Sequence, residues 1–168
     1  MKSLAPIVLA LGFTVLSCSS TQELKEDVKP GLATCLKESQ EQLKIEWGTL
    51  DNYDRQEGLG YKLTAEREVL AVQHFINTER TLRPALRVLT NDEYCELAKE
   101  VNAIFLKVQA LHSPGEKGRF IRYTNAPSGV YLRAVWNPEL ETFQSRDMRA
   151  LYDKLMQLIP TEESGTNN

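Results

Sequence analysis

Apolar residues recur at helical spacing in the first half of the chain, and each apolar stripe has a polar side opposite it. This pattern predicts a first helix over residues 32–47 and a second helix that begins with Thr64 as its N-cap. The residues expected to be buried are Leu32, Leu36, Leu43 and Trp47 in the first helix, and Val69, Val72 and Ile76 in the second. Residues 48–61, between the two, are rich in Gly, Asp and Asn, which predicts the longest internal loop.

The helical pattern is most complete after residue 89. Thr90 and Glu93 have the spacing of a capping box, and Leu89 and Tyr94 have that of a hydrophobic staple. A continuous apolar stripe then runs through Leu97, Val101, Ile104, Phe105, Val108 and Leu111. A third helix is therefore predicted, and residues 113–115 (Ser-Pro-Gly) end it.

The period of the pattern then changes from helical to alternating. Residues 119–124 and 130–136 are rich in β-branched and aromatic side chains and flank a turn-forming stretch at 125–129, which predicts a β-hairpin. In its second strand, the alternating residues expected to be buried are Val130, Leu132, Ala134 and Trp136. A last helix is predicted from about residue 146, with Ser145 as its cap, to Pro160. Residues 81–89 contain Pro84 and fit an edge strand, a helical turn or a connector.

Together these elements predict an α+β fold. About four amphipathic helices are expected to pack on a small antiparallel sheet that contains the β-hairpin of the C-terminal half. The chain has 168 residues, of which 42% are hydrophobic and 26% charged, values that are typical of one globular domain.

The first residues have the shape of a signal peptide. Lys2 gives a positive start, the apolar run at 4–16 is shorter than the ~20 residues of a membrane span, and polar residues follow at once. The run ends in Val15-Leu16-Ser17-Cys18, which resembles the lipobox of bacterial lipoproteins. That resemblance implies cleavage before Cys18 and attachment of diacylglycerol and fatty acids such as palmitate to Cys18, which anchor the protein to a membrane.

The resemblance and the composition together predict four segments. They are a signal peptide at 1–17, the lipidated cysteine and a polar tether at 18–30, one globular domain at 31–160 and a disordered tail at 161–168. Ser19 follows the cysteine in place of the Asp that retains such proteins at the inner membrane. For a host with two membranes, the resemblance implies an outer-membrane location facing the periplasm; for a host with one membrane, the expected location is the outer face of the plasma membrane.

Cys35 and Cys95 remain after Cys18 is lipidated, and an exported domain lies where disulfides persist. We expect these two cysteines to be bonded; two buried free thiols are the alternative. Closing this loop would stabilise the fold by roughly 4 kcal/mol in the chain-entropy interpretation.

No catalytic residue, metal site or cofactor is predicted. His74 and His112 have no second ligand at metal-binding spacing, and no hydrolase, zinc, phosphate-loop or dinucleotide motif is present. The formal net charge of −3 argues against a nucleic-acid partner.

The polar feature that points to binding is the hairpin, whose Arg and Tyr side chains favour interfaces and anionic ligands. The candidate binding residues are Lys117, Arg119, Arg122, Tyr123, Tyr131 and Arg133. A solvated sheet face that discourages edge pairing is the alternative explanation. Arg80, Arg83 and Arg87 would extend the patch only if residues 81–89 fold beside the hairpin.

The preferred functional hypothesis is therefore a non-catalytic envelope lipoprotein that binds a protein or peptidoglycan near the membrane, as an assembly, inhibitor or immunity factor. Two alternatives stay open. One is an envelope hydrolase acting on peptidoglycan or peptides through carboxylates from distant positions. The other is a carrier of a small lipid in an apolar pocket between helices and sheet.

Overall fold

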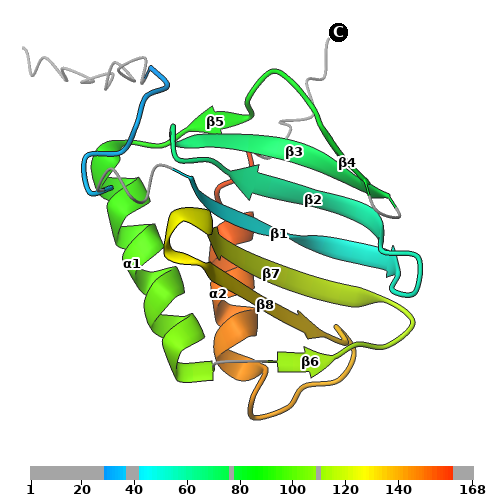
Figure 1. The fold of residues 1–168 in the computed structure, drawn as a ribbon. Helices are drawn as coiled ribbons and strands as arrows, with labels where there is room; N and C mark the ends of the chain where they lie inside the picture. Colours follow the sequence, from blue (N-terminus) through cyan, green and yellow to red (C-terminus); the bar gives the residue numbers. More distant parts are fainter. Residues whose placement is uncertain (1–28, 37–41, 76–77, 109–110, 161–168) are drawn as a thin grey trace, which may run out of the picture.

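The computed structural model describes residues 29–36, 42–75, 78–108 and 111–160. The predicted signal peptide, Cys18, most of the tether and the tail at 161–168 lie outside these residues. The described residues form one eight-stranded sheet and two α-helices, so the prediction of about four helices on a small sheet is wrong (Figure 1).

The strands follow the order β4-β3-β2-β1-β7-β8-β6 across the sheet, and β5 pairs with β3. All paired strands are antiparallel except β6 and β8, which are parallel. The elements are β1 (Leu43–Asn52), β2 (Glu57–Leu63), β3 (Glu68–Phe75), β4 (Thr78–Thr81), β5 (Arg87–Val88), α1 (Asn91–Val108), β6 (Leu111–Ser113), β7 (Gly118–Asn125), the 3-10 helix η2 (Ala126–Ser128), β8 (Val130–Trp136) and α2 (Arg146–Met156).

The first expected helix is replaced by β1, the central strand of the sheet. Leu43 and Trp47 fit one face of a helix, but Leu43, Ile45 and Trp47 also alternate with polar residues, and this second period decides the structure. β1 pairs with β2 on one side and with β7 on the other. Pairing partners that are distant in sequence therefore override the local helical pattern.

The second expected helix is the strand β3. Thr64 does not cap a helix; it begins the turn between β2 and β3, in which the Arg67 N–H donates to the Thr64 carbonyl at 3.0 Å. Val69 packs on the helix side of the sheet, whereas Leu70 and Val72 are buried on the other side. Because β3 is covered on both faces, its run of apolar residues imitates a buried helix. Ile76 lies outside the described residues.

The expected loop at 48–61 is a hairpin formed by β1 and β2. Only the turn around residues 53–56 is irregular, with the Gln56 N–H donating to the Tyr53 carbonyl at 3.1 Å. Gly48 and Gly58 are strand residues at close approaches, since a Cβ at Gly58 would lie 2.0 Å from the Thr49 oxygen and one at Gly48 would lie 2.4 Å from the Leu59 oxygen. These glycines permit strand pairing here rather than a loop.

The second half of the chain follows the sequence prediction more closely, although the third helix ends at Val108 and Leu111, expected in its apolar stripe, begins β6. The capping box is confirmed, since the Thr90 N–H donates to Glu93 Oε2 at 2.8 Å and the Glu93 N–H donates to Thr90 Oγ1 at 3.2 Å. The hairpin is confirmed as β7 and β8 joined by η2. Ser145 occupies the N-cap of α2, but its side chain bonds with Thr142 and makes no cap hydrogen bond. Residues 81–89, left open above, lie between β4 and β5 and contribute to both strands.

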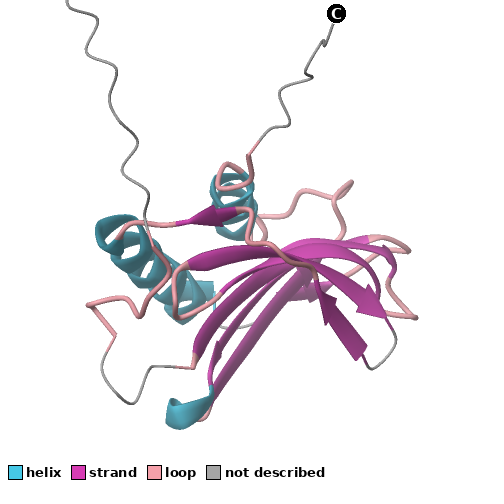
Figure 2. Ribbon diagram, turned by 90° about the horizontal axis from the view of Figure 1, so that it is seen from above, coloured by secondary structure: helices cyan, strands magenta, loops and turns pink. Residues whose placement is uncertain are grey.

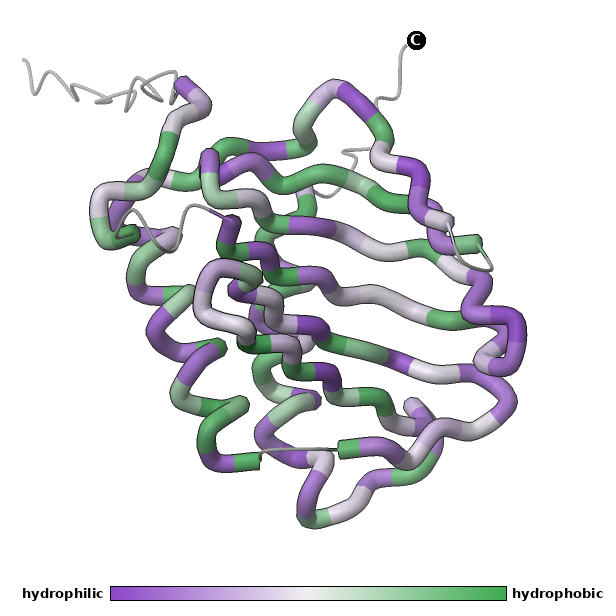
Figure 3. Tube along the Cα trace, viewed as in Figure 1, coloured by the Kyte–Doolittle hydropathy of each residue, from purple (hydrophilic) through white to green (hydrophobic). Residues whose placement is uncertain are grey.

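Both helices cover the same face of the strongly curved sheet (Figure 2). Phe105 of α1 packs against Tyr123 of β7, and Tyr152 of α2 meets Trp136 of β8 edge-on, at 5.7 Å between ring centroids. The largest side chains in this layer, Trp47, Trp136, Tyr94 and Phe105, are fully buried. Hydrophobic and hydrophilic residues alternate along the strands (Figure 3). This layer is the main core of the protein.

The start of the described chain is tied to the domain in two ways. Cys35 and Cys95 form the expected disulfide, but it joins a turn before β1 to α1 rather than two helices. Nearby, the Arg67 guanidinium donates to the carbonyls of Lys29, Gly31 and Leu89 at 2.7–2.9 Å. None of the described helices is long and apolar enough to cross a membrane.

Candidate functional site

Three glycines lie at the centre of the sheet face opposite α1 and α2. We call this face the helix-free face. Gly48 on β1 pairs with Gly60 on β2, and Gly58 lies on the same face of β2; we call these three residues the glycine floor. β3 and β7 are separated by β2 and β1, which would place them ~14 Å apart in a flat sheet. Yet the rings of His74 and Phe120 meet edge-on at 5.2 Å. The sheet therefore curls around the glycine floor.

Beside the glycine floor, four charged residues from four neighbouring strands stand in register. Glu46 on β1 is opposite Lys62 on β2 and Arg122 on β7, and Arg122 is opposite Arg133 on β8. We call this row, Lys62, Glu46, Arg122 and Arg133, the charge ladder. Like charges directly opposite each other destabilise a sheet, so the two arginines at its end require an explanation.

Glu46 is the buried centre of the ladder, with 0% of its surface exposed. Arg122 Nη1 donates to Glu46 Oε2 at 3.1 Å. Lys44 Nζ lies 3.2 Å from Oε1, but the contact is not aligned as a hydrogen bond, so no N–H of the described residues donates to that oxygen. Glu46 therefore holds two cations near the floor of the site.

Glu79 of β4 is a neighbour of Glu46, and the two side chains form a pair of carboxyls. Burial raises the pKa of Glu46, and a side-chain hydrogen bond with Glu79 adds to the rise, while Arg122 and Lys44 oppose it. Burial also works to raise the pKa of Glu79, but hydrogen bonds with Lys62, at 2.7 Å, and with Glu46 outweigh it and hold that pKa at about 2. Glu46 is thus the member of the pair that takes up a proton first as the pH falls.

Arg133 is the last residue of the charge ladder, and it has no carboxylate partner among the described residues. Its Nη2 donates to the neutral amide oxygen of Gln56 at 2.5 Å, and its buried Nε has no hydrogen-bond partner there. Burial and the neighbouring Arg122 lower the pKa of the Arg133 guanidinium. Arg133 is therefore a partly buried cation next to another cation, and no carboxylate of the described residues pairs with it.

His74 is another incompletely satisfied group of this face. It is 8% exposed, and its Nε2 has no hydrogen-bond partner among the described residues. Burial and the charge of Arg122 lower the pKa of this imidazole. His74 consequently favours the neutral form, in which one ring nitrogen donates a hydrogen bond and the other accepts one.

These groups surround a cavity of about 330 Å³. Its lining is Leu50, Gln56, His74, Phe75, Thr78, Glu79, Phe120, Arg122 and Arg133. The volume is at the lower end of the range found for small-molecule sites, and the lining combines aromatic walls with a few convergent polar groups.

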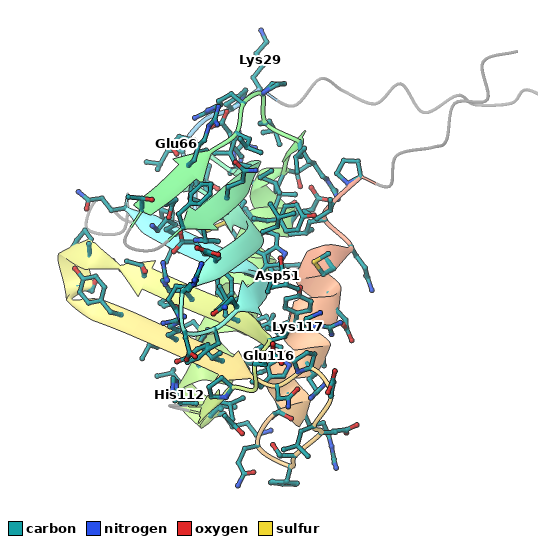
Figure 4. All side chains as sticks on the ribbon, turned by 90° about the vertical axis from the view of Figure 1, so that its right-hand side faces the viewer. Lys29, Asp51, Glu66, His112, Glu116 and Lys117 are labelled. Atoms are coloured by element: carbon teal, nitrogen blue, oxygen red, sulfur yellow. A yellow bond between two sulfur atoms is a disulfide. The ribbon has the colours of Figure 1, made fainter. Side chains whose placement is uncertain are left out.

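Of the binding residues predicted from the sequence, the fold brings Arg122 and Arg133 together at the cavity. Tyr131 is on the same face but is 67% exposed. Arg119 points to the helix side, with its guanidinium 4.9 Å from the Tyr152 ring centre, and Tyr123 is buried there. Lys117 lies in the exposed loop before β7 (Figure 4). The predicted patch is therefore divided between the two faces and a loop.

The arginines at 80, 83 and 87 do not extend the site. β4 and β5 lie on the β3 side of the sheet, whereas β8 lies across β1 and β7. Arg83 pairs with Glu68 at 2.8 Å and Arg87 with Glu93 at 2.5 Å. The condition set for their participation, folding beside the hairpin, is not met.

Sequence reasoning missed Glu46, His74, Glu79 and Phe120. The alternation of Lys44, Glu46 and Gly48 with apolar residues was the available signal for Glu46, but it was assigned to a helix. His112, expected at the end of the third helix, lies in β6, where Nε2 is 3.0 Å from the Tyr53 hydroxyl. The described residues contain no group of three or more His, Cys, Asp or Glu side chains placed to hold a metal ion.

Comparison with known proteins gives no family assignment: no protein-family model and no curated protein matches this sequence.

Proposed function

We propose that this protein is a membrane-anchored envelope lipoprotein that binds an anionic partner on the helix-free face of its sheet, without catalysing a reaction. The observation that carries the proposal is Arg133, a partly buried guanidinium beside Arg122 that has no carboxylate partner among the described residues. Guanidinium groups bind carboxylates and phosphates through paired hydrogen bonds, so an external anion would complete the charge ladder.

The anchor in this proposal is lipid on Cys18, supported by the lipobox resemblance, with outer-membrane placement supported by Ser19. Metabolic labelling with a palmitate analogue should label the wild-type chain in a bacterial host, and Cys18→Ala should abolish the labelling. Labelling that persists in Cys18→Ala would contradict the anchor.

The binding step is tested by co-sedimentation of the purified protein with peptidoglycan sacculi, which carry peptide carboxylates. Arg122→Glu combined with Arg133→Glu should reduce the bound fraction at least tenfold, because both cations become anions. Arg80→Glu is the matched control, since Arg80 is an exposed strand arginine on the other face of the sheet.

A hydrolase remains the second candidate, because two carboxyls with opposite pKa shifts meet at the same place. Such a pair can divide acid and base roles. Two features argue against it: Glu46 has no exposed surface, and hydrogen-bonded carboxyls are closer than the ~5–9.5 Å separations used by most glycosidases. Release of soluble fragments from sacculi that Glu79→Gln abolishes would favour the hydrolase over the binding protein.

The third alternative, a lipid held between helices and sheet, gains no support, because large buried side chains occupy that layer.

A further inference from the structure

We infer that the cavity lined by Arg122 and Arg133 on the helix-free face binds a terminal carboxylate flanked by a short apolar group. This inference rests on the proposed function, since it specifies which anion the helix-free face takes and where that anion is held.

The carboxylate end is assigned by the two arginines. Arg122 and Arg133 are direct cross-strand neighbours, and both line the cavity. Arg122 has one carboxylate partner, Glu46, while the hydrogen-bond partner of Arg133 is the neutral amide of Gln56. A planar carboxylate between two guanidinium groups would balance like charges that otherwise face each other, and it matches their forked donors.

The charge of the surroundings favours an anion, and Glu79 favours one negative charge over two. Lys44, Lys62, Arg122 and Arg133 are accompanied by only two carboxyls, Glu46 and Glu79, so the cluster has a net positive charge. Glu79 itself lines the cavity, however, and its low pKa keeps it ionised. A phosphate, which carries more than one negative charge near pH 7, would be repelled by Glu79 more strongly than a carboxylate would.

The apolar group is assigned by the remaining walls. Leu50, Phe75 and Phe120 line the cavity, and Phe120 meets the nearly buried ring of His74. The ring of His74 completes this wall; its buried Nε2 has no hydrogen-bond partner among the described residues. A volume of about 330 Å³ admits a small group such as a single aromatic ring, and not a long acyl chain.

The glycine floor lets the ring of His74 lie close to the sheet. A Cβ at Gly60 would lie 2.7 Å from the Trp47 carbonyl oxygen and 3.0 Å from His74 Nε2. A side chain at Gly60 would therefore displace His74, which lines the cavity.

Calorimetric titration of the purified protein tests the inference with four probes: phenylacetate, its neutral analogue phenylacetamide, inorganic phosphate and the tripeptide Ala-Ala-Phe with a free carboxyl end. We expect phenylacetate or the tripeptide to bind at least tenfold more tightly than phenylacetamide and phosphate. Binding of phenylacetate identifies a free acid as a sufficient ligand, and binding of the tripeptide alone identifies the end of a peptide chain. Both results support the inference.

Arg133→Gln should weaken the carboxylate probe at least tenfold, whereas Arg80→Gln should leave it unchanged. Circular dichroism melting of each variant checks that the fold is intact, and Arg133→Lys, which keeps the charge but loses the fork, should bind with intermediate affinity. Equal affinity of wild type and Arg133→Gln, or preference for phosphate, would overturn the inference.

The two proposals fail in distinguishable ways. If no carboxylate probe binds but the double charge reversal at Arg122 and Arg133 still abolishes co-sedimentation with sacculi, the carboxylate cavity is wrong and the anion-binding face stands. If co-sedimentation is also unaffected by the reversal, both are wrong.

Discussion

On the helix side of β1, Leu43, Ile45 and Trp47 are buried beneath the helical layer, whereas Lys44, Glu46 and Gly48 of the same strand lie on the helix-free face. The helix side gains stability from tightly packed apolar surface. The helix-free face also has a small apolar cluster, but beside it this face buries a carboxylate and leaves two arginines adjacent. Residues that alternate along one strand thus pack on one side and, in our proposal, serve recognition on the other.

The largest expected effect is on the packing side. Trp47 is fully buried in the main core, so Trp47→Ala should lower the free energy of unfolding by about 3–5 kcal/mol. Urea denaturation followed by circular dichroism measures it. Tyr131→Ala, on the other face and largely exposed, is the control and should change stability by less than about 0.5 kcal/mol. Similar losses in the two variants would remove the distinction between the faces.

Glu46 is the residue through which the helix-free face contributes most to stability. Glu46→Leu should cost about 2–3 kcal/mol, because Arg122 and Lys44 lose their buried counter-charge while both remain about one-third exposed. Glu46→Gln should cost less than half as much, since the amide keeps the shape of the side chain and its oxygen can still accept the hydrogen bond from Arg122. Equal losses in the two variants, measured by the same urea titration at pH 7, would show that the hydrogen bond from Arg122 adds nothing to the effect of the charge.

The smallest expected effect is a pH dependence from His74. The folded protein binds a proton on His74 less tightly than the unfolded chain does, because its pKa is lowered from 6.5. Stability should therefore be complete above about pH 6.5 and fall as the pH drops below it. The difference in urea midpoint between wild type and His74→Gln, compared at pH 5.5 and pH 7.5, isolates this contribution from that of Glu46. A difference that does not change with pH would rule it out.

How far the sequence predicted this molecule depends on the range of the interactions involved. The capping box at Thr90 and the hairpin of β7 and β8 are local, and both were predicted correctly. β1 and β3 were assigned to helices because their spacing also fits a helical stripe, and only pairing with distant strands selects the alternating period. The glycines at 48, 58 and 60 indicated a loop for the same reason: the close approach that requires them is between strands.

The residues of the candidate site divide in the same way, into those that a local pattern predicted and those that depend on distant strand pairing. The outward direction of Arg133 followed from alternation within β8, and Arg122 was identified as part of the hairpin. Glu46, His74 and Glu79 could not be joined to them, because their proximity depends on the register of β1 and β4 and on the curvature of the sheet. A charged residue inside an apolar stretch, such as Glu46, was the one signal that was available and not used.

The hydrogen bonds from Arg67 to the carbonyls of Lys29 and Gly31 attach the start of the described chain to the folded domain. With lipid on Cys18, ten residues would lie between the lipidated cysteine and Lys29, and this segment would reach at most ~40 Å when fully extended. Lys29 lies at one edge of the sheet and His112 at the other (Figure 4). The edge at Lys29 would then lie nearer the lipid. Because the Arg67 contacts set the length of the segment between the lipid and the domain, they would also set the largest distance from the membrane at which the cavity could meet its ligand.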